Sequence, residues 1–134
     1  MFKKFVYLVL GLFLILALEL VINTFRAPVD LGESERFTEK ELRSAVLVIR
    51  LDCLTDPDYR LRDLRYVGDE LSLIRQEYLS SFPEEYGDFD ECAVFMADFH
   101  SPRHWSKAAD DLDWEIVLGR KAGGSWRILR QGEG

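Results

Sequence analysis

The chain opens with an almost unbroken apolar run. Residues 5–25 contain one charged side chain, Glu19, and are preceded by Lys3 and Lys4. A helix rises about 1.5 Å per residue, so roughly 20 residues cross the ~30 Å hydrocarbon core of a bilayer. The pattern predicts a transmembrane signal anchor over residues 1–26, with residues 5–25 in contact with the membrane lipid.

The two lysines also predict the orientation of this anchor. Positive residues that flank an apolar segment stay in the cytoplasm, which places the rest of the chain outside it. A cleaved signal peptide is the alternative, because the run from Phe5 to Leu18 also has signal-peptide length. Its cleavage signal is poor, since Ile15 stands two residues before the small Ala17. The sequence thus predicts a single-pass cell-membrane protein or, after cleavage, a secreted one.

A polar segment without a regular period, residues 27–36, is predicted to be a linker. The next segment begins with a capping box, in which Thr38 is the N-cap and Glu41 stands three residues later. Apolar residues then recur at the spacing of one helical face. They are Leu42, Ala45, Val46, Ile49 and Cys53. The pattern predicts a helix over residues 38–52, at the start of an extracytoplasmic domain over residues 37–134.

Four later segments, bounded by turn residues, have the short apolar patterns of strands. They span residues 60–67, 92–100, 113–120 and 125–130. The last two are joined by a short glycine turn, which is typical of a hairpin. The order of elements predicts an α+β fold in which a long helix packs on an antiparallel sheet of about four strands.

A second, shorter helix is predicted over residues 70–82, where apolar residues again recur at helical spacing. They are Leu71, Ile74, Tyr78 and Phe82. An acidic loop over residues 84–91 is expected to follow it.

The strand period of two predicts which way the tryptophans of the hairpin face. Trp114 with Ile116, and Trp126 with Ile128, are expected to pack on the helix face that carries Val46 and Ile49. Trp105 stands in a polar segment and is the better candidate for an exposed contact.

Charge narrows the range of partners. Residues 27–134 contain 14 Lys and Arg against 23 Asp and Glu, a net charge of −9. This sign opposes binding to the phosphate backbone of nucleic acids and to anionic membrane surfaces. Nucleic acid is therefore not an expected partner. A small ligand or another envelope protein is compatible with the negative charge.

The two cysteines, Cys53 and Cys92, leave two interpretations open. Outside the cytoplasm they can form a disulfide. A bridge would close a loop of about 40 residues and stabilise the fold by roughly 4 kcal/mol if unstrained. Two buried free thiols are equally consistent with the sequence.

Several local motifs together resemble those of small exported proteins of Gram-positive bacteria, which are domains of unknown function. The motifs are FTEKELRSAV, LRDLRYVGDE, AVFMADFH and DWEIVLGRKAGGSWRILRQGEG. The positions that match the pattern are Thr38, Glu41, Asp98, Phe99, Trp114, Leu118, Arg120 and Trp126. The resemblance covers residues 37–132 and implies the cystatin-like fold of nuclear transport factor 2 and ketosteroid isomerase. It brings no established catalytic residue.

Candidate site residues are few. In ketosteroid isomerase-like folds the space between helix and sheet becomes a pocket with an aspartate base. Asp98 and Tyr66 stand at strand ends and could face such a pocket, and His100 and Trp105 follow in the same region. These four residues form the candidate ligand-binding set.

Metal and cofactor motifs are weak. His100 and His104 are four residues apart, but the intervening Pro102 favours a loop over a helix, and no third ligand stands at a diagnostic spacing. The acidic segment 110–113 lacks the spaced ligands of a calcium-binding EF-hand loop. No Ser-His-Asp order, nucleophile elbow or phosphate loop is visible. No metal, cofactor or catalytic residue is expected.

These patterns favour a membrane-anchored extracytoplasmic domain that acts as a non-catalytic binding or interaction module. The alternative is a small cystatin-like-fold enzyme, of the isomerase or hydrolase type, that uses a pocket between helix and sheet. A closed, aromatic-lined cavity with Asp98 at its floor would favour the enzyme.

Overall fold

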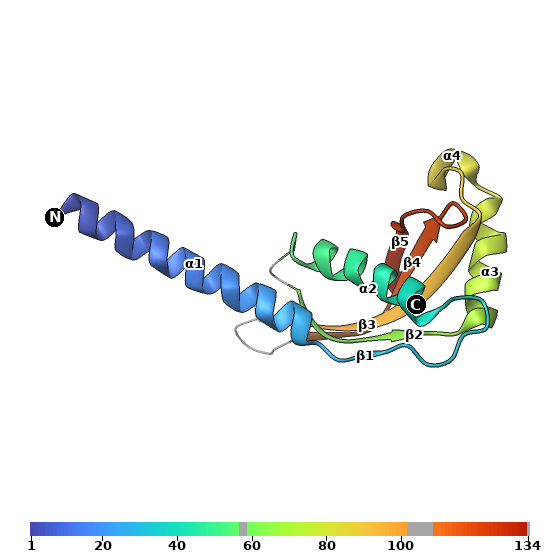
Figure 1. The fold of residues 1–134 in the computed structure, drawn as a ribbon, viewed down its shortest axis with the longest axis horizontal. Helices are drawn as coiled ribbons and strands as arrows, with labels where there is room; N and C mark the ends of the chain where they lie inside the picture. Colours follow the sequence, from blue (N-terminus) through green and yellow to red (C-terminus); the bar gives the residue numbers. More distant parts are fainter. Residues whose placement is uncertain (57–58, 102–108, 134) are drawn as a thin grey trace.

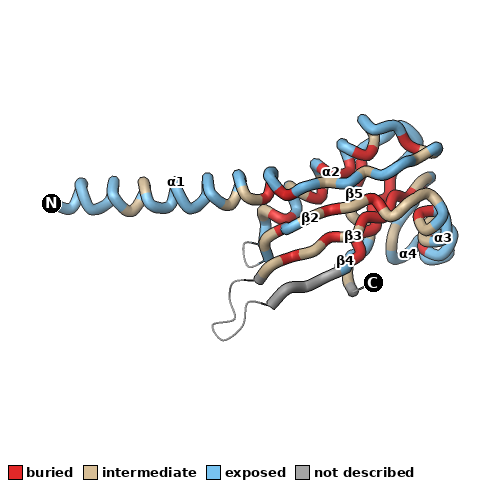
Figure 2. Tube along the Cα trace, turned by 90° about the horizontal axis from the view of Figure 1, so that it is seen from below, coloured by how far each residue is buried: buried red, intermediate tan, exposed pale blue. Residues whose placement is uncertain are grey.

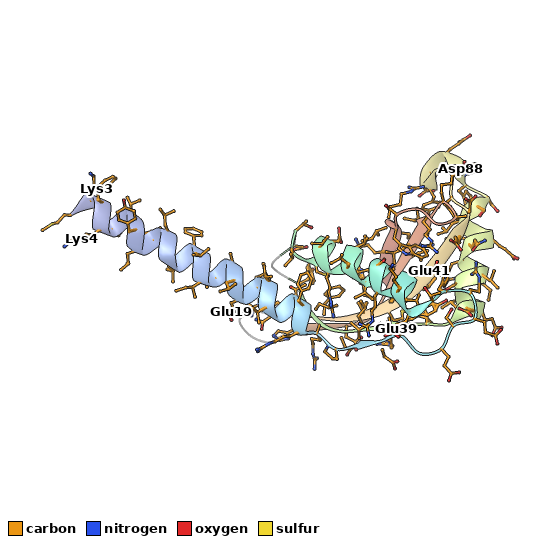
Figure 3. All side chains as sticks on the ribbon, viewed as in Figure 1. Lys3, Lys4, Glu19, Glu39, Glu41 and Asp88 are labelled. Atoms are coloured by element: carbon orange, nitrogen blue, oxygen red, sulfur yellow. The ribbon has the colours of Figure 1, made fainter. Side chains whose placement is uncertain are left out.

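The structure is a computed structural model that describes residues 1–56, 59–101 and 109–133. Helix α1 (Phe2–Arg26) projects away from the folded part of the chain (Figure 1). It is 25 residues long, and long and apolar enough to cross a membrane, a property that signal sequences share. Its residues are exposed along nearly its whole length (Figure 2). Lys3 and Lys4 lie at its free end, and Glu19 lies nearer the domain (Figure 3).

The strands form one sheet whose spatial order follows the chain. They are β1 (Val29–Asp30), β2 (Arg60–Tyr66), β3 (Glu91–Ser101), β4 (Ala109–Arg120) and β5 (Arg127–Glu133). The last four pair antiparallel, and β1 pairs parallel with β2. The predicted α+β class and the N-terminal apolar helix are confirmed. The sheet, however, is mixed and has five strands.

The extra strand comes from residues 27–36, which the sequence predicts as a linker. The backbone amide of Leu64 donates to the carbonyl of Pro28 at 3.0 Å, just before β1. The Ser34 hydroxyl donates to the carboxylate of Asp69. The backbone amides of Glu35 and Arg36 donate to the same carboxylate. This segment is therefore held along the domain at both ends.

Helix α2 (Glu39–Cys53) begins as the capping box predicts. The Glu41 amide donates to the Thr38 hydroxyl at 3.1 Å, and the Thr38 amide donates to the Glu41 carboxylate at 3.0 Å. The predicted apolar face is buried. Its residues are Leu42, Ala45, Val46, Ile49 and Cys53.

This face of α2 shares a core cluster with alternate residues of the strands. The strand members are Leu61, Leu64, Tyr66, Ala93, Phe95, Ala97, Phe99, Ile116 and Leu118. Trp126 is buried in the cluster, and Trp114 and Ile128 pack against it, as the sequence predicts. The Trp126 indole N–H donates to the Glu41 carbonyl at 3.0 Å. Trp126 precedes β5 instead of lying in it.

The second predicted helix, α3 (Asp69–Ser80), covers the other face of the sheet, and the short α4 (Pro83–Tyr86) follows it. Leu79 clusters with Cys92, Val94 and Val117, which alternate along β3 and β4 with the residues under α2. Successive strand residues point to opposite faces. Therefore α2 and α3 lie on opposite faces of the sheet.

The apolar spacing predicts helix α3 but does not mark the side by which it binds the sheet. Ile74, Tyr78 and Phe82 are exposed, and the helix buries Ser72 and Leu79 instead. The buried hydroxyl of Ser72 accepts from the Val94 amide at 3.1 Å and donates to the Tyr66 hydroxyl at 3.2 Å. These hydrogen bonds make a polar residue the contact point, which an apolar pattern cannot indicate.

The cysteines are both buried and free. Cys53 clusters with the α2 face of the sheet, whereas Cys92 clusters with the α3 face. Cys53 and Phe99 line the same pocket, and Cys92 stands seven residues before Phe99 on β3. Seven strand residues span roughly 23 Å, and a disulfide requires Cα atoms within about 7 Å. The structure therefore contains the two free thiols and no Cys53–Cys92 bridge.

Arg120, at the end of β4, is a buried charge with two acidic partners. Its guanidinium is ion-paired with Glu41 of α2 and lies 2.8 Å from the Glu91 carboxylate of β3. It also lies over the Trp126 ring, 4.2 Å from the centroid. Removing one member of such a group leaves an unpaired buried charge, which is strongly destabilising.

We expect Trp126→Ala to lower the free energy of unfolding by about 3–5 kcal/mol, because it removes a large buried ring. Thr38→Ala should cost only about 1 kcal/mol, because the loss is confined to the helix cap. Urea unfolding of the full chain in detergent, followed by circular dichroism, measures both. A nearly neutral Trp126→Ala would contradict the core position of Trp126.

Acid should weaken the fold through Glu41. The Thr38 backbone amide, and then the Arg120 guanidinium, lower the pKa of Glu41 from its ordinary value of 4.5. A carboxylate with a lowered folded-state pKa stabilises above its unfolded pKa, and this contribution is lost as pH falls through the folded value. Glu41→Gln should therefore cost more stability at pH 7 than at pH 3. An equal loss at the two pH values, measured by urea unfolding, would contradict this, and the exposed Glu39→Gln is the control.

Candidate functional site

A pocket of about 340 Å³ lies between the C-terminal end of α2 and the sheet. Its volume falls in the range of small-molecule sites, roughly 300–1,000 Å³. The lining residues come from four elements and from the segment after α2. They are Asp52, Cys53, Thr55, Asp56, Tyr59, Phe99, Trp114, Ile116 and Gln131.

The inner lining is apolar and mostly aromatic. Phe99 of β3 and Trp114 and Ile116 of β4 belong to the strand positions that face α2. Tyr59, just before β2, meets Phe99 edge to face, with ring centroids 6.4 Å apart. The period of two along the strands therefore supplies the aromatic surface, and the end of α2 leaves it partly uncovered.

The edge of the pocket is polar and negatively charged. Gln131 of β5 donates to the Asp52 carboxylate at 3.3 Å and accepts from the Trp114 indole N–H at 3.4 Å. Asp56 lines the same edge. The last carbonyls of α2 carry the negative end of the helix dipole. This combination favours a cation or a hydrogen-bond donor over an anion.

Cys53 is the lining residue with the most strongly shifted pKa. Burial, and secondarily the charge of Asp52, raises the pKa of its thiol to about 12. The thiolate is the nucleophilic form of cysteine. At neutral pH Cys53 is therefore a small apolar wall of the pocket and not a nucleophile.

Tyr66, one of the sequence-predicted site residues, lies in the core away from this pocket. Its ring contacts Phe37 and Phe95, with centroids 6.3 Å and 5.5 Å away. Its hydroxyl donates to Asp69 at 2.7 Å and accepts from Ser72. Burial raises the pKa of this hydroxyl to about 12. Tyr66 therefore joins α3 to the core and does not line the pocket.

Asp98 and His100 stand on either side of Phe99 in β3. Because Phe99 points toward α2, its neighbours project to the opposite face of the sheet. There Asp98 accepts from the Asp113 backbone amide at 2.8 Å and lies 3.6 Å from the Arg65 guanidinium. The amide hydrogen bond is the main cause that lowers the pKa of Asp98. The predicted aspartate thus does not stand at the floor of the pocket.

Asp98 belongs to a polar group around an irregular part of the sheet. The pairing register shifts between Leu61 and Asp63 in β2 and between Ala97 and Phe99 in β3. Burial, and then the neighbouring Asp98, raises the pKa of Asp63. Asp98 therefore has a structural role at the place where the pairing of the strands is irregular.

Trp105 and His104 lie outside the described residues, and of Asp110 and Asp111 only the backbone is described. Within the described part of the chain, no group of three His, Cys, Asp or Glu side chains is placed to hold a metal ion. The pocket residues that sequence reasoning missed include Phe99 and Gln131. Strand alternation identifies Phe99 as inward-facing, whereas nothing local marks Gln131.

Comparisons of the chain with protein-family models, with curated proteins and with solved structures find no match. The site therefore has to be interpreted from its own geometry.

Proposed function

We propose that this protein is a membrane-anchored extracytoplasmic binding module that holds a small amphiphilic molecule in the pocket at the end of α2. The observation that carries this proposal is the combination of an aromatic inner lining with an acidic edge in a space of about 340 Å³. Ligand sites typically join a mainly apolar wall to a few orienting polar groups. The cystatin-like fold inferred from the local motifs is part of the same proposal.

The lining favours binding over catalysis. Cys53 is held as the neutral thiol. Asp52 is bonded to Gln131. Among the described lining residues, none is a histidine or lysine that could serve as a base for a hydroxyl or thiol nucleophile. Asp98 projects from the opposite face of the sheet. A binding role requires none of these groups to be activated.

The position of the pocket supports an amphiphile from the membrane as its ligand. Arg50 of α2 donates to the Ala27 carbonyl at 3.2 Å and lies over the Phe25 ring at 5.5 Å. Asp52, two residues after Arg50, is the first residue along the chain that lines the pocket. The site is thus close to the point where α1 meets the domain. Its acidic edge favours neutral or cationic head groups over anionic ones.

The orientation in this proposal rests on charge. Lys3 and Lys4 precede α1, and the positive-inside tendency places them in the cytoplasm. The domain that follows carries a net negative charge, which does not oppose export in this orientation.

Binding is tested with two probes that share one fluorophore and differ in charge: cationic dansylcadaverine and anionic dansylglycine. The full chain is placed in phosphatidylcholine nanodiscs. We expect dansylcadaverine to bind about tenfold more tightly, since a favourable charge contact of about 1.4 kcal/mol corresponds to that factor. Asp52→Asn should reduce the difference.

Gln131→Trp, which fills the mouth of the pocket, should abolish the binding of dansylcadaverine. Ser80→Trp adds the same ring at an exposed site on α3 and should leave binding unchanged. Equal binding to the wild-type chain and Gln131→Trp would show that the fluorophore binds elsewhere and would overturn the proposed site.

Topology is tested separately with reporters fused after Gly134. We expect alkaline phosphatase to be active, because it requires export, and a cytoplasm-only fluorescent reporter to be dark. Membrane retention of the full-length mass distinguishes an anchor from a signal peptide, which would release a shorter fragment. Bright cytoplasmic fluorescence without phosphatase activity would overturn the orientation.

A further inference from the structure

Helix α3 has an apolar surface that the fold does not use. Ile74, Tyr78 and Phe82 are 50%, 53% and 42% exposed. They are spaced four residues apart and therefore follow one side of the helix and its C-terminal extension. The rings of Tyr78 and Phe82 touch, with centroids 5.3 Å apart. We call these three residues the α3 stripe.

The stripe is separate from the contacts that hold α3 on the sheet. Those contacts include Leu71 and Leu79, the buried hydroxyl of Ser72, and the side chains of Arg75 and Gln76, which bind Glu115 and the Cys92 amide of the sheet. A helix needs one apolar side to pack on its own domain, and a second exposed apolar side is typical of a surface for a partner.

The surroundings of the stripe are acidic. Residues 69–90 contain seven Asp and Glu and a single basic residue, Arg75. Glu70 and Glu77 are exposed on α3, and the exposed Glu84 and Glu85 follow in α4. The Arg75 guanidinium is already paired with the Glu115 carboxylate at 2.6 Å. The stripe therefore combines apolar contact with negative charge.

The location of the stripe narrows the choice of partner. Helix α3 lies at the end of the sheet opposite to the end from which α1 leaves (Figure 1). A membrane that holds α1 is therefore remote from α3, and anionic lipid would also be repelled. A second copy of the chain would set one acidic surface against another, which is unfavourable.

We propose that the α3 stripe is a docking surface for an amphipathic helix with basic flanks, carried by another protein of the envelope. Apolar residues of that helix at i and i+4 spacing pack against Tyr78 and its neighbours. Its Lys and Arg side chains meet Glu70, Glu77 and the acidic residues of α4. This is the helix-on-helix mode of peptide recognition, with charge setting the choice of partner. The proposal is independent of the ligand pocket, and the envelope location of the partner rests on the proposed export of the domain.

The probes are two synthetic amphipathic peptides of equal length and leucine spacing, one with lysine and one with glutamate on the polar side. Each is titrated by fluorescence anisotropy into the full chain in phosphatidylcholine nanodiscs. We expect the lysine peptide to bind and the glutamate peptide not to bind, and the affinity of the lysine peptide to fall as salt is raised.

The variant Ile74→Ser/Tyr78→Ser should weaken the lysine peptide at least tenfold. Leu47→Ser/Leu51→Ser is the matched control, because these α2 residues have the same spacing and are 48% and 52% exposed. Both pairs are at the surface, so folding should survive, and circular dichroism checks this. Comparison between the variants cancels the binding of the peptide to lipid.

Equal affinity for both peptides, or equal loss in both double variants, would overturn the proposal. Sedimentation of the full chain in detergent tests whether the stripe binds a second copy of the chain. A dimer that is abolished by Ile74→Ser/Tyr78→Ser would assign the stripe to a second copy of the chain and would also overturn the proposed partner.

Discussion

The buried guanidinium of Arg120 is the contact on which the arrangement of this domain most depends. It joins the first turn of α2, through Glu41, to the start of β3, through Glu91. The same group covers Trp126, whose indole N–H binds the α2 backbone. A charge buried in this way is tolerated only when its partners are in place. Arg120 therefore couples three features of the fold: the position of α2 on the sheet, the start of β5 and the cap of α2.

The two faces of the sheet differ in the size of their core clusters and in the surfaces that lie beside them. The α2 face has the larger cluster, and at one end α2 stops short and leaves the aromatic pocket. The α3 face has a smaller cluster, centred on Leu79 and Val94, and a hydrogen bond from the sheet to Ser72. The pocket and the α3 stripe thus lie on different sides of the same strands. Each surface can be changed without rebuilding the other.

Much of the fold could be predicted from the sequence because its signals are local. The capping box at Thr38 and Glu41 gives the start of α2 to the residue. The period of two gives the core positions of β3 and β4, including the tryptophan contacts with α2. The short β1 could not be predicted, because two residues have no period and their pairing with Leu64 and Arg65 is a long-range contact.

The features that the sequence does not predict depend on contacts between distant residues. The apolar spacing of α3 predicts the helix, but the hydrogen bonds of Ser72 to Val94 and Tyr66 bury a different side from that of Ile74 and Tyr78. A position at a strand end allows Asp98 to face a pocket, but strand alternation puts Phe99 in the lining instead. The pocket itself joins residues between 52 and 131, so no local motif could describe it.

The short parallel strand β1 has a consequence for how the domain is oriented relative to α1. Only Ala27 and Pro28 separate α1 from β1, and β1 is hydrogen-bonded into the sheet. No flexible tether intervenes, so rotation of the helix is passed directly to the domain. One residue added to a helix turns everything beyond it by about 100°. The number of residues in α1 therefore determines the side of that helix toward which the pocket and the α3 stripe are turned.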